Sequence, residues 1–322
     1  MRIVRGLGAR LRRPCCLAVG VFDGVHKGHL SIISEALRRA EKSGSVPAVL
    51  TFDPHPDAVI SAEGAPPLLT TTDEKLALFR CLGVRLVVVA PFDRALARIA
   101  AEEFVREVLV AKLRARCLVV GEGWRFGRGG EGTPALLREM APQFGFSVDV
   151  VPSAVARRAK ISSTRIRQLL LRGRVSPAQE LLGRRYQVAG EVVQGSGLGR
   201  KLGYPTANIE VARAKLLPAD GVYACLAGLR KRRPAMAYIG RRPTVAREGE
   251  RRLEVHFGEA GRWLDLLGRA LRVEFAARLR GEKKFFSTAA LTAQAALTAQ
   301  MARDWVRARK VLASLHAKGD VL

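Results

Sequence analysis

The chain has 322 residues, 48% of them apolar, and its 55 Lys and Arg against 29 Asp and Glu give a formal net charge of +26. This length favours two domains, each with its own core. No apolar run approaches the ~20 residues that cross a bilayer, which excludes a membrane-spanning helix. The charge would suit nucleic acid, but the basic residues are scattered rather than gathered into one tail, so we favour a compositional habit over a nucleic-acid partner.

The five cysteines are odd in number and form no C-x-x-C pair, and four of them lie in or beside apolar runs. Reduced thiols pack there as small hydrophobic groups, which predicts a reducing compartment. The apolar run near the N-terminus leads directly into "FDGVHKGH", without the small-residue cleavage site of a signal peptide. We therefore expect a cytoplasmic protein.

The first half of the chain alternates short β-rich runs with helical patterns. The strand-like runs are "CLAVGVF" (16–22), "PAVLTF" (47–52), "RLVVVAPF" (85–92), "CLVVGEG" (117–123) and "FSVDVVP" (146–152). Two more helical patterns follow them, "STRIRQLLLRG" and "SPAQELLG". This alternation predicts an α/β domain with a parallel, doubly wound, Rossmann-like sheet.

Glycines and histidines concentrate in "GVFDGVHKGH" (20–29), between the first strand-like run and the helical pattern after it. In a parallel sheet this turn lies at the carboxyl ends of the strands, where ligands bind. His26 and His29 are three residues apart at the helix start and share a face. The N–H groups and the positive dipole end of that helix attract phosphate. The predicted nucleotide-phosphate site comprises Phe22, Asp23, Gly24, His26, Gly28 and His29.

A second segment, "KISSTRIR" (160–167), fits the same site. Its hydroxyl residues can cap the helix that follows, and Arg165 would point back toward a bound phosphate. We therefore add Ser163, Thr164 and Arg165 to the predicted phosphate contacts. A substrate that already carries a phosphate could attack the α-phosphate of ATP there, so the site needs no nucleophile of its own.

The segment "TFDPHP" (51–56) ends the second strand-like run. Its prolines fix a rigid turn. Asp53 and His55 could also line the phosphate site. The residues alone leave both interpretations open.

The pattern changes at "GRRYQVAG" (183–190), after which short runs alternate with a period of two residues and turn residues separate them. This pattern predicts a small antiparallel β-barrel. A helical pattern returns only from about 287 to 317. We therefore predict two domains, 1–183 and 184–322, the second a barrel closed by a C-terminal helix.

The segment "GSGLGRKLGYPTAN" (195–208) combines glycines whose N–H groups can cradle phosphate with two basic residues. It is not a P-loop, because Leu202 follows Lys201. Pro205 would fix a turn that aims Thr206 and Asn208 in one direction, and both offer the hard oxygen ligands that suit Mg²⁺. A Gly-rich hairpin loop explains the segment equally well. The predicted ATP site comprises Gly195, Gly197, Gly199, Arg200, Lys201, Thr206 and Asn208, with Thr206 and Asn208 also binding Mg²⁺.

The run "LEVHF" (253–257) alternates as a strand, with Leu253, Val255 and Phe257 on the expected core face. Glu254 shares the other face with His256. A carboxylate beside a metal-nucleotide loop can accept the proton of an alcohol during phosphoryl transfer. Glu254 is therefore the candidate base, and a solvent-facing glutamate is the alternative.

Together these segments, with "LPADGVYA" and "IGRRPT", resemble the bifunctional bacterial riboflavin kinase/FMN adenylyltransferases, also called FAD synthetases. The resemblance covers nearly the whole chain. It implies a nucleotidyltransferase-type α/β domain joined to a six-stranded riboflavin kinase barrel with a C-terminal helix. It also implies that riboflavin, FMN and ATP are substrates, that Mg²⁺ accompanies ATP, and that FMN and FAD are products. In this family His26 and His29 would contact ATP phosphates, and Glu254 would act as base on the ribityl 5′-hydroxyl.

The chain departs from the family pattern at a few positions. Gly123 stands where an Asp is expected and Trp124 where a Phe is expected, while Leu267 takes the place of a Tyr. The first change removes a carboxylate from the adenylylation site. The nearest alternative is therefore a riboflavin kinase with a weakened adenylyltransferase domain. A nucleic-acid-binding protein is a remote alternative, because an aromatic content of 6% is sparse for base stacking.

Overall fold

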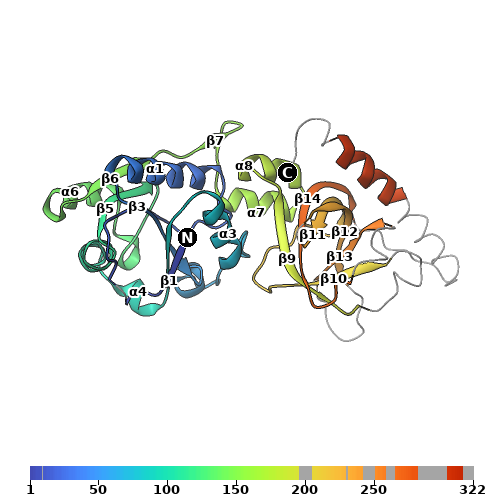
Figure 1. Ribbon diagram of the computed structural model, residues 1–322, viewed down its shortest axis with the longest axis horizontal. Coiled ribbons are helices and arrows are strands. Elements are labelled where there is room, and N and C mark those ends of the chain that lie inside the picture. The colour runs from blue at the N-terminus through green and yellow to red at the C-terminus, as the bar shows by residue number, and fades with distance from the viewer. Residues whose placement is uncertain are drawn as a thin grey trace. The chain divides into compact units, whose positions relative to one another are not determined.

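Residues 1–8, 10–195, 205–229, 231–241, 251–258, 265–281 and 303–314 are described in a computed structural model of the chain. The chain divides into two units, Met1–Ser163 and Thr164–Leu322 (Figure 1). The domain limits 1–183 and 184–322 remain a prediction, because packing within a unit does not show which segment folds alone. No helix among the described residues is long and apolar enough to cross a membrane.

The first unit is built on a six-stranded sheet in which every neighbouring pair is parallel. Its strands, in sheet order, are β1 (Arg2–Arg5), β4 (Leu86–Pro91), β3 (Val46–Asp53), β2 (Cys15–Val19), β5 (Ala115–Gly121) and β6 (Ser147–Val151). The predicted doubly wound parallel sheet is therefore confirmed. The edge strand β1 was not expected, because two of its four residues are arginines and its run is too short to show a pattern.

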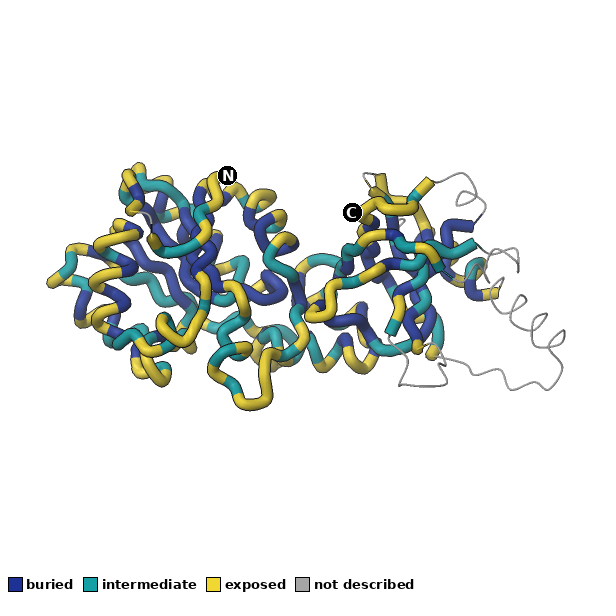
Figure 2. Tube along the Cα trace, turned by 90° about the horizontal axis from the view of Figure 1, so that it is seen from below, coloured by how far each residue is buried: buried dark blue, intermediate teal, exposed yellow. Residues whose placement is uncertain are grey.

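Helices cover both faces of this sheet and bury two separate cores (Figures 1 and 2). Alternate strand residues supply them, so that Leu17 belongs to one core and Cys16 to the other. The helices are α1 (Lys27–Ser43), α2 (Asp57–Ile60), α3 (Thr72–Cys81), α4 (Arg94–Arg98), α5 (Ala101–Glu103), the π-helix η1 (Phe104–Lys112), the 3₁₀ turn η2 (Arg128–Gly130) and α6 (Pro134–Phe144). A small hairpin, β7 (Val155–Ala156) and β8 (Ala159–Lys160), follows β6.

The second unit is a closed six-stranded barrel preceded by two helices, α7 (Ser163–Leu171) and α8 (Val175–Leu182). Every neighbouring strand pair is antiparallel, which confirms the predicted barrel. Its strands, in barrel order, are β10 (Thr206–Val211), β13 (Arg251–His256), β12 (Arg233–Arg241), β11 (Gly221–Gly228), β14 (Ala270–Gly281) and β9 (Tyr186–Val193).

The residues directly after Pro205, where the sequence predicted a turn, form the strand β10. Thr206, Ile209 and Val211 are β-branched, which favours extended backbone. Thr206 and Asn208 still lie on one face, because alternate residues of a strand point the same way.

The C-terminal helix is described over 303–314, and the remainder of its predicted range lies outside the described residues. Ala308 and Leu312 of this helix are buried against Val222 and Met236 of the barrel. Asp304 is only 1% exposed and pairs with Arg280 at 2.8 Å. The helix therefore covers one outer side of the barrel.

Candidate functional site

The predicted phosphate turn lies at the topological switch point of the first sheet. β2 stands between β3 and β5, and the connections from β2 and β5 lead to opposite ends of the strand order. In open α/β sheets this is the position at which ligands bind. The turn 20–29 follows β2, and the segment that contains Gly123 follows β5.

The backbone of this turn adopts an uncommon conformation. Phe22 and Val25 have φ values of 53° and 40°, and Gly24 between them has a φ of 85°. Left-handed backbone is costly for a bulky or β-branched residue and persists only where its surroundings hold it. The turn is therefore a preorganised feature of the fold.

The Asp23 carboxylate makes two of the hydrogen bonds that hold the turn. Asp23 is 3% exposed, and its two carboxylate oxygens accept hydrogen bonds from the backbone N–H groups of Leu69 at 3.0 Å and Thr70 at 2.9 Å. The Gly24 N–H donates to the Thr70 hydroxyl at 2.9 Å. In this structure the Asp23 carboxylate therefore binds the segment that leads into α3, and direct contact with phosphate remains a prediction for it.

The two histidines lie together at the start of α1. The His29 N–H donates to Nδ1 of His26 at 3.3 Å, so His26 caps the helix, and the two rings stack with centroids 3.6 Å apart. Because Nδ1 of His26 accepts a hydrogen bond, a neutral ring carries its proton on Nε2 and can donate from there. A Cβ on Gly28 would lie 3.2 Å from the His26 ring, so glycine leaves room for this arrangement.

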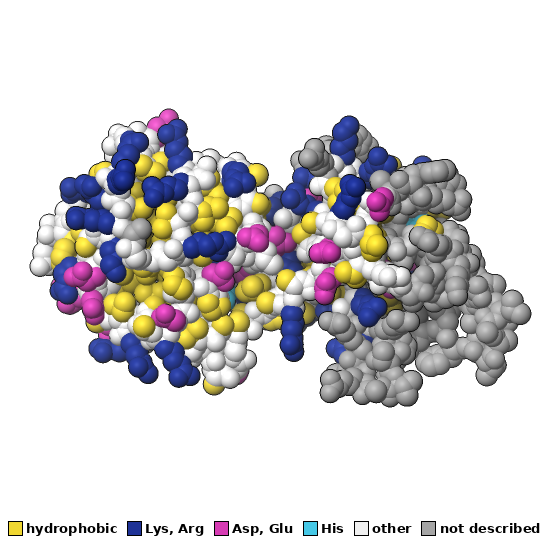
Figure 3. Space-filling view, turned by 60° about the horizontal axis from the view of Figure 1, so that its bottom comes forward, with side chains coloured by type: hydrophobic (Ala, Val, Ile, Leu, Met, Phe, Trp, Pro, Cys, Tyr) yellow, Lys and Arg dark blue, Asp and Glu magenta, His cyan; other side chains and the backbone are white. Residues whose placement is uncertain are grey.

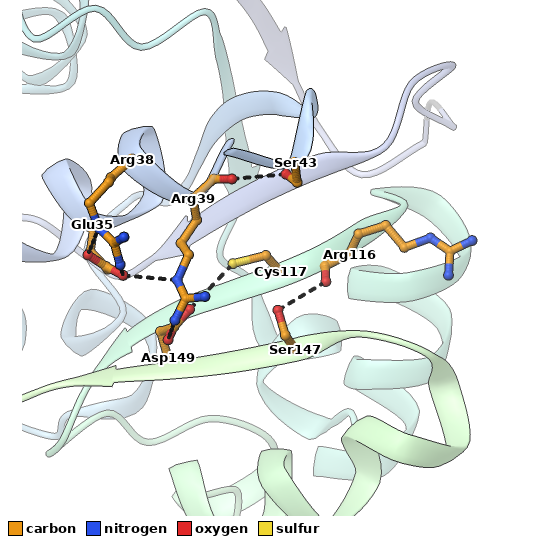
Figure 4. A network of polar contacts seen from close by, with 8 residues as sticks. All are labelled: Glu35, Arg38, Arg39, Ser43, Arg116, Cys117, Ser147 and Asp149. Carbon is orange, nitrogen blue, oxygen red and sulfur yellow. Dashed lines mark hydrogen bonds and ion pairs between the residues drawn. The ribbon is translucent and has the colours of Figure 1, made fainter. Parts of the chain in front are cut away.

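A polar network fixes α1 against the sheet (Figure 4). Arg39 binds Glu35 at 3.0 Å on its own helix and Asp149 on β6. Hydrogen bonds from Arg38 and then Arg39 hold the pKa of Glu35 below its ordinary value. The Cys117 thiol lies 3.8 Å from the same Asp149. These contacts fix the direction of the helix whose first turn carries His29.

The segment "ISSTRIR" contacts the phosphate turn through Ser163, whose hydroxyl donates to the backbone oxygen of Asp23 at 2.8 Å. Thr164 and Arg165 are the next two residues of α7 and belong to the second unit. Their contacts with a phosphate remain a prediction.

The "TFDPHP" turn follows β3, the neighbour of β2. His55 uses Nδ1 to accept a hydrogen bond from the Asp57 N–H at 3.2 Å, at the start of α2. Asp53 is exposed. The contact of His55 supports the rigid-turn interpretation.

Gly123 occupies a position that a larger residue could fill. A Cβ there would meet Nζ of Lys160 at 3.6 Å, which is an ordinary contact. Trp124 stacks on Phe126 with ring centroids 4.5 Å apart. Glycine at 123 is therefore not required by packing.

The barrel brings the predicted kinase residues together. The Thr206 hydroxyl donates to the Glu254 carboxylate at 3.2 Å, and Asn208 lies directly opposite Glu254 across β10 and β13. A Cβ on Gly195 would lie 1.9 Å from Nδ2 of Asn208, so only glycine allows the amide to sit where it does. The other predicted members, Gly197, Gly199, Arg200 and Lys201, lie outside the described residues.

Two buried side chains beside these sites were missed in the sequence. His256 is 3% exposed and its Nδ1 lies 2.9 Å from the Pro205 backbone oxygen. Burial lowers the pKa of His256, and the hydrogen bond with Pro205 opposes this. The Trp305 ring, from the C-terminal helix, packs edge-on at 5.4 Å. The two-residue alternation predicted a solvent-facing position for His256. It could not show the burial, because the helix that covers His256 lies about 50 residues further along the chain.

The second missed residue is Lys75 of α3, which is 5% exposed. The sequence did hold a sign of this burial. Lys75 lies four residues before the completely buried Phe79, and residues four apart share a helix face. Burial lowers the pKa of the Lys75 ammonium, and the carboxylates of Asp23 and Asp53 oppose this.

The oxygen atoms of Thr206, Asn208 and Glu254 suit Mg²⁺, which prefers hard oxygen ligands and keeps several waters. The described residues contain no group of three or more His, Cys, Asp and Glu side chains placed to hold a metal ion. A few hard oxygen donors fit an ion that also binds the phosphates of ATP.

Known proteins match both halves of the chain. A family model described as FAD synthetase matches residues 9–165, and one described as riboflavin kinase matches 182–312. The bifunctional riboflavin kinase/FMN adenylyltransferase of Escherichia coli K12 is 36% identical over 96% of this chain and 97% of its own length. That of Haemophilus influenzae is 34% identical over 88% of this chain and 92% of its own length.

The fold also matches a solved structure over most of the chain. A protein of Streptococcus pneumoniae described as a macrolide-efflux protein superposes with a TM-score of 0.80 at 30% identity, over 94% of this chain and 99% of that one. Both units are therefore paired with counterparts in one solved chain. By its sequence and by the order of its two units, this chain belongs to the family of bifunctional riboflavin kinase/FMN adenylyltransferases.

Proposed function

We propose that this chain phosphorylates riboflavin to FMN with ATP and then adenylylates FMN to FAD. The observation that carries the proposal is that each unit brings together the motif residues its own reaction needs. These are the stacked His26–His29 pair at the switch point and the Thr206–Glu254 contact in the barrel. The alternative with a weakened adenylyltransferase is not favoured, because both family models match.

In the kinase reaction the 5′-hydroxyl of riboflavin attacks the γ-phosphorus of ATP. The new P–O bond forms as the bond to the ADP oxygen breaks. Glu254 accepts the hydroxyl proton, and Thr206 holds the carboxylate through the 3.2 Å hydrogen bond. Asn208, placed by its close packing on Gly195, presents an amide beside the same carboxylate.

In the adenylyltransferase reaction a phosphate oxygen of FMN attacks the α-phosphorus of ATP, and pyrophosphate leaves. No proton is removed from carbon and no side chain is modified, so positioning and charge stabilisation supply the catalysis. The Nε2–H of His26, the ring of His29 and the N–H groups of the first turn of α1 would stabilise charge on the phosphate oxygens. Ser163, Thr164 and Arg165 are proposed to contact the same phosphates.

Mg²⁺ is proposed to accompany ATP at both steps, with Thr206 and Asn208 as its protein ligands in the barrel. When bound, it would neutralise charge on the phosphate oxygens. We also propose a cytoplasmic location, which the five free cysteines favour. No nucleic-acid partner is proposed, since Lys and Arg are spread over the face shown in Figure 3 rather than gathered in one patch.

The direct test is a time course with riboflavin, ATP and Mg²⁺, in which riboflavin, FMN and FAD are separated and quantified. We expect FMN to rise first and FAD to follow, with one pyrophosphate released for each FAD. A second reaction supplied with FMN should form FAD without any riboflavin. If FMN accumulates in the first reaction without FAD, or if supplied FMN gives no FAD in the second, the adenylyltransferase half of the proposal is contradicted.

A further inference from the structure

Lys75 carries a charged group that is almost fully enclosed at the carboxyl ends of two strands. Its Nζ lies 3.3 Å from the backbone oxygen of Val21, 3.4 Å from the Thr51 hydroxyl and 3.4 Å from the backbone oxygen of Phe52. The side chain is 5% exposed, and Thr51 is completely buried. An enclosed cation is retained at a cost in stability, so its contacts call for an explanation.

The three contacts match the protonated form of the amine. An ammonium has three N–H donors and no acceptor. The two backbone oxygens can only accept, and the Thr51 hydroxyl donates its own proton to Val21 at 3.0 Å. Its lone pairs are therefore left to accept from Lys75. All three neighbours act as acceptors, so the geometry calls for a charged Lys75.

The same contacts join the two turns of the adenylyltransferase site. Val21 is followed by Phe22, the first residue of the phosphate turn with positive φ. Phe52 is followed by Asp53 of the "TFDPHP" turn. Lys75 thus binds one carbonyl in each segment, that of Val21, two residues after the end of β2, and that of Phe52, the last residue but one of β3.

The segment around Lys75 also holds the far side of the phosphate turn. Leu69 and Thr70 bind the Asp23 carboxylate, and Glu74 completes the cap of α3 with Thr71. Two attachments therefore hold the turn: the segment before α3 binds Asp23, and Lys75 binds Val21. Asp23 and Asp53 are the carboxylates that act on the ammonium.

We propose that Lys75 is a positioning residue of the adenylyltransferase site, whose buried ammonium fixes the phosphate turn and contributes positive charge beneath the pyrophosphate portion of ATP. The proposal rests on the function proposed above, because it takes the turn at His26 and His29 as the phosphate site. It assigns Lys75 no proton transfer and no covalent step.

The test is Lys75→Met, which keeps an unbranched side chain as far as Cε and removes the charged amine. The reverse reaction, FAD with inorganic pyrophosphate giving FMN and ATP, reports the first unit alone. We expect kcat/KM for pyrophosphate in this reaction to fall at least ~10-fold, since small displacements of positioning groups cost this much or more. The KM for pyrophosphate should rise while the KM for FAD stays within about two-fold, and riboflavin phosphorylation should not change.

Arg80→Met is the matched control, because Arg80 is an exposed cation on the same helix. It should leave both reactions unchanged. A loss of equal size in Arg80→Met would mean that the general charge of α3 matters, and would overturn the proposal. Equal rises in both KM values for Lys75→Met would also overturn it in favour of a structural role.

Lys75→Gln, which keeps two N–H donors without a charge, covers the case in which Lys75→Met fails to fold. If the first unit unfolds in both variants while kinase activity persists, Lys75 is structural and the proposal is wrong.

The double variant His26→Ala with His29→Ala separates the two proposals. If it still forms FAD at the wild-type rate, the phosphate site itself is misplaced. If it loses FAD formation and Lys75→Met does not, only the role of Lys75 fails.

Discussion

Among single residues, Glu254 has the most sharply defined proposed role. It accepts a hydrogen bond from Thr206 at 3.2 Å and faces Asn208 across the strand pair. Glu254→Gln keeps the shape and removes the proton acceptor. We expect FMN formation to fall by roughly 10²–10⁴, the usual contribution of a general base. The rate of FMN formation under saturating ATP and riboflavin measures this directly.

The control for this variant is the other reaction of the same chain. Adenylylation of supplied FMN should proceed at the wild-type rate, because the proposed site for it lies in the other unit. Near-normal phosphorylation of riboflavin by Glu254→Gln would reject Glu254 as the base. A loss of both activities would instead indicate a general folding defect.

Gly195 gives a second prediction at this scale. An added Cβ would lie 1.9 Å from Nδ2 of Asn208 and 2.7 Å from its Cγ, so one of the two residues must move. Gly195→Ala should therefore displace the Asn208 amide and weaken the use of ATP by the kinase. We expect kcat/KM for ATP to fall by at least ~10-fold in riboflavin phosphorylation, because a misplaced positioning group costs about this much.

Gly8→Ala offers a matched control for Gly195→Ala, because a Cβ on Gly8 would meet no atom within 4 Å. It should leave the kinase unchanged. If Gly195→Ala behaves like Gly8→Ala, then Asn208 either tolerates the shift or does not contribute to ATP binding.

Some site residues could be predicted from local patterns and others could not. Glu254 and His26 stand in short motifs whose strand or turn was evident from neighbouring residues. His256 and Lys75 are buried by elements distant in sequence: Trp305 covers the first, and the ends of β2 and β3 enclose the second. A local pattern shows which face of its own element a residue occupies, but not which distant element covers that face.

At the scale of elements, α1 carries ion pairs between its own side chains. Glu35 binds Arg38 at 2.8 Å and Arg39 at 3.0 Å, and these hydrogen bonds lower its pKa. A lowered folded-state pKa stabilises the fold above the unfolded-state pKa, and this stabilisation is lost as the pH falls through the folded-state value. Because the pairs are largely exposed, we expect Glu35→Gln to reduce the free energy of unfolding by only about 0.2–1 kcal/mol at neutral pH.

Denaturant unfolding of wild type and Glu35→Gln at several pH values measures this difference. The two curves should converge as the pH falls through the lowered pKa of Glu35, because the wild-type carboxyl is then neutral as well. Glu41→Gln, which removes the charge of an exposed glutamate on the same helix, is the matched control and should reduce the free energy of unfolding less than Glu35→Gln does. A difference that grows toward low pH would contradict the assignment.

Element types were predicted more reliably than element limits. The five strand-like runs of the first half all form strands, because apolar β-rich runs between turn residues have few other stable arrangements. The run at Arg2–Arg5 is too short and too basic to show a pattern, and it becomes a strand only because β4 offers a parallel edge. The strand β10 was hidden by Pro205 and the glycines before it.

At the scale of the whole molecule, the position of the domain limit is open to experiment. The sequence pattern changes near residue 184, whereas packing assigns α7 and α8 to the second unit. The backbone oxygen of Leu170 accepts a hydrogen bond from Ala219 at 2.9 Å, and the Ser176 hydroxyl donates to Ala276 at 3.3 Å. Both helices are thus attached to the barrel by specific hydrogen bonds.

Two fragments, 164–322 and 184–322, decide between these limits. Leu181 and Leu182 of α8 are 2% and 1% exposed, and a buried leucine contributes roughly 1.5–3 kcal/mol. We therefore expect 164–322 to be more stable toward denaturant by at least about 2 kcal/mol, because the shorter fragment leaves the surface under α8 exposed.

Both fragments should make FMN, since Glu254, Thr206 and Asn208 are present in each. Neither should make FAD, since the proposed adenylyltransferase residues before 164 are absent. Equal stability would place the limit at 184, as the sequence pattern predicts. A folded 164–322 that cannot phosphorylate riboflavin would show that the kinase depends on the first unit, and the two activities would then not be separable by cutting the chain.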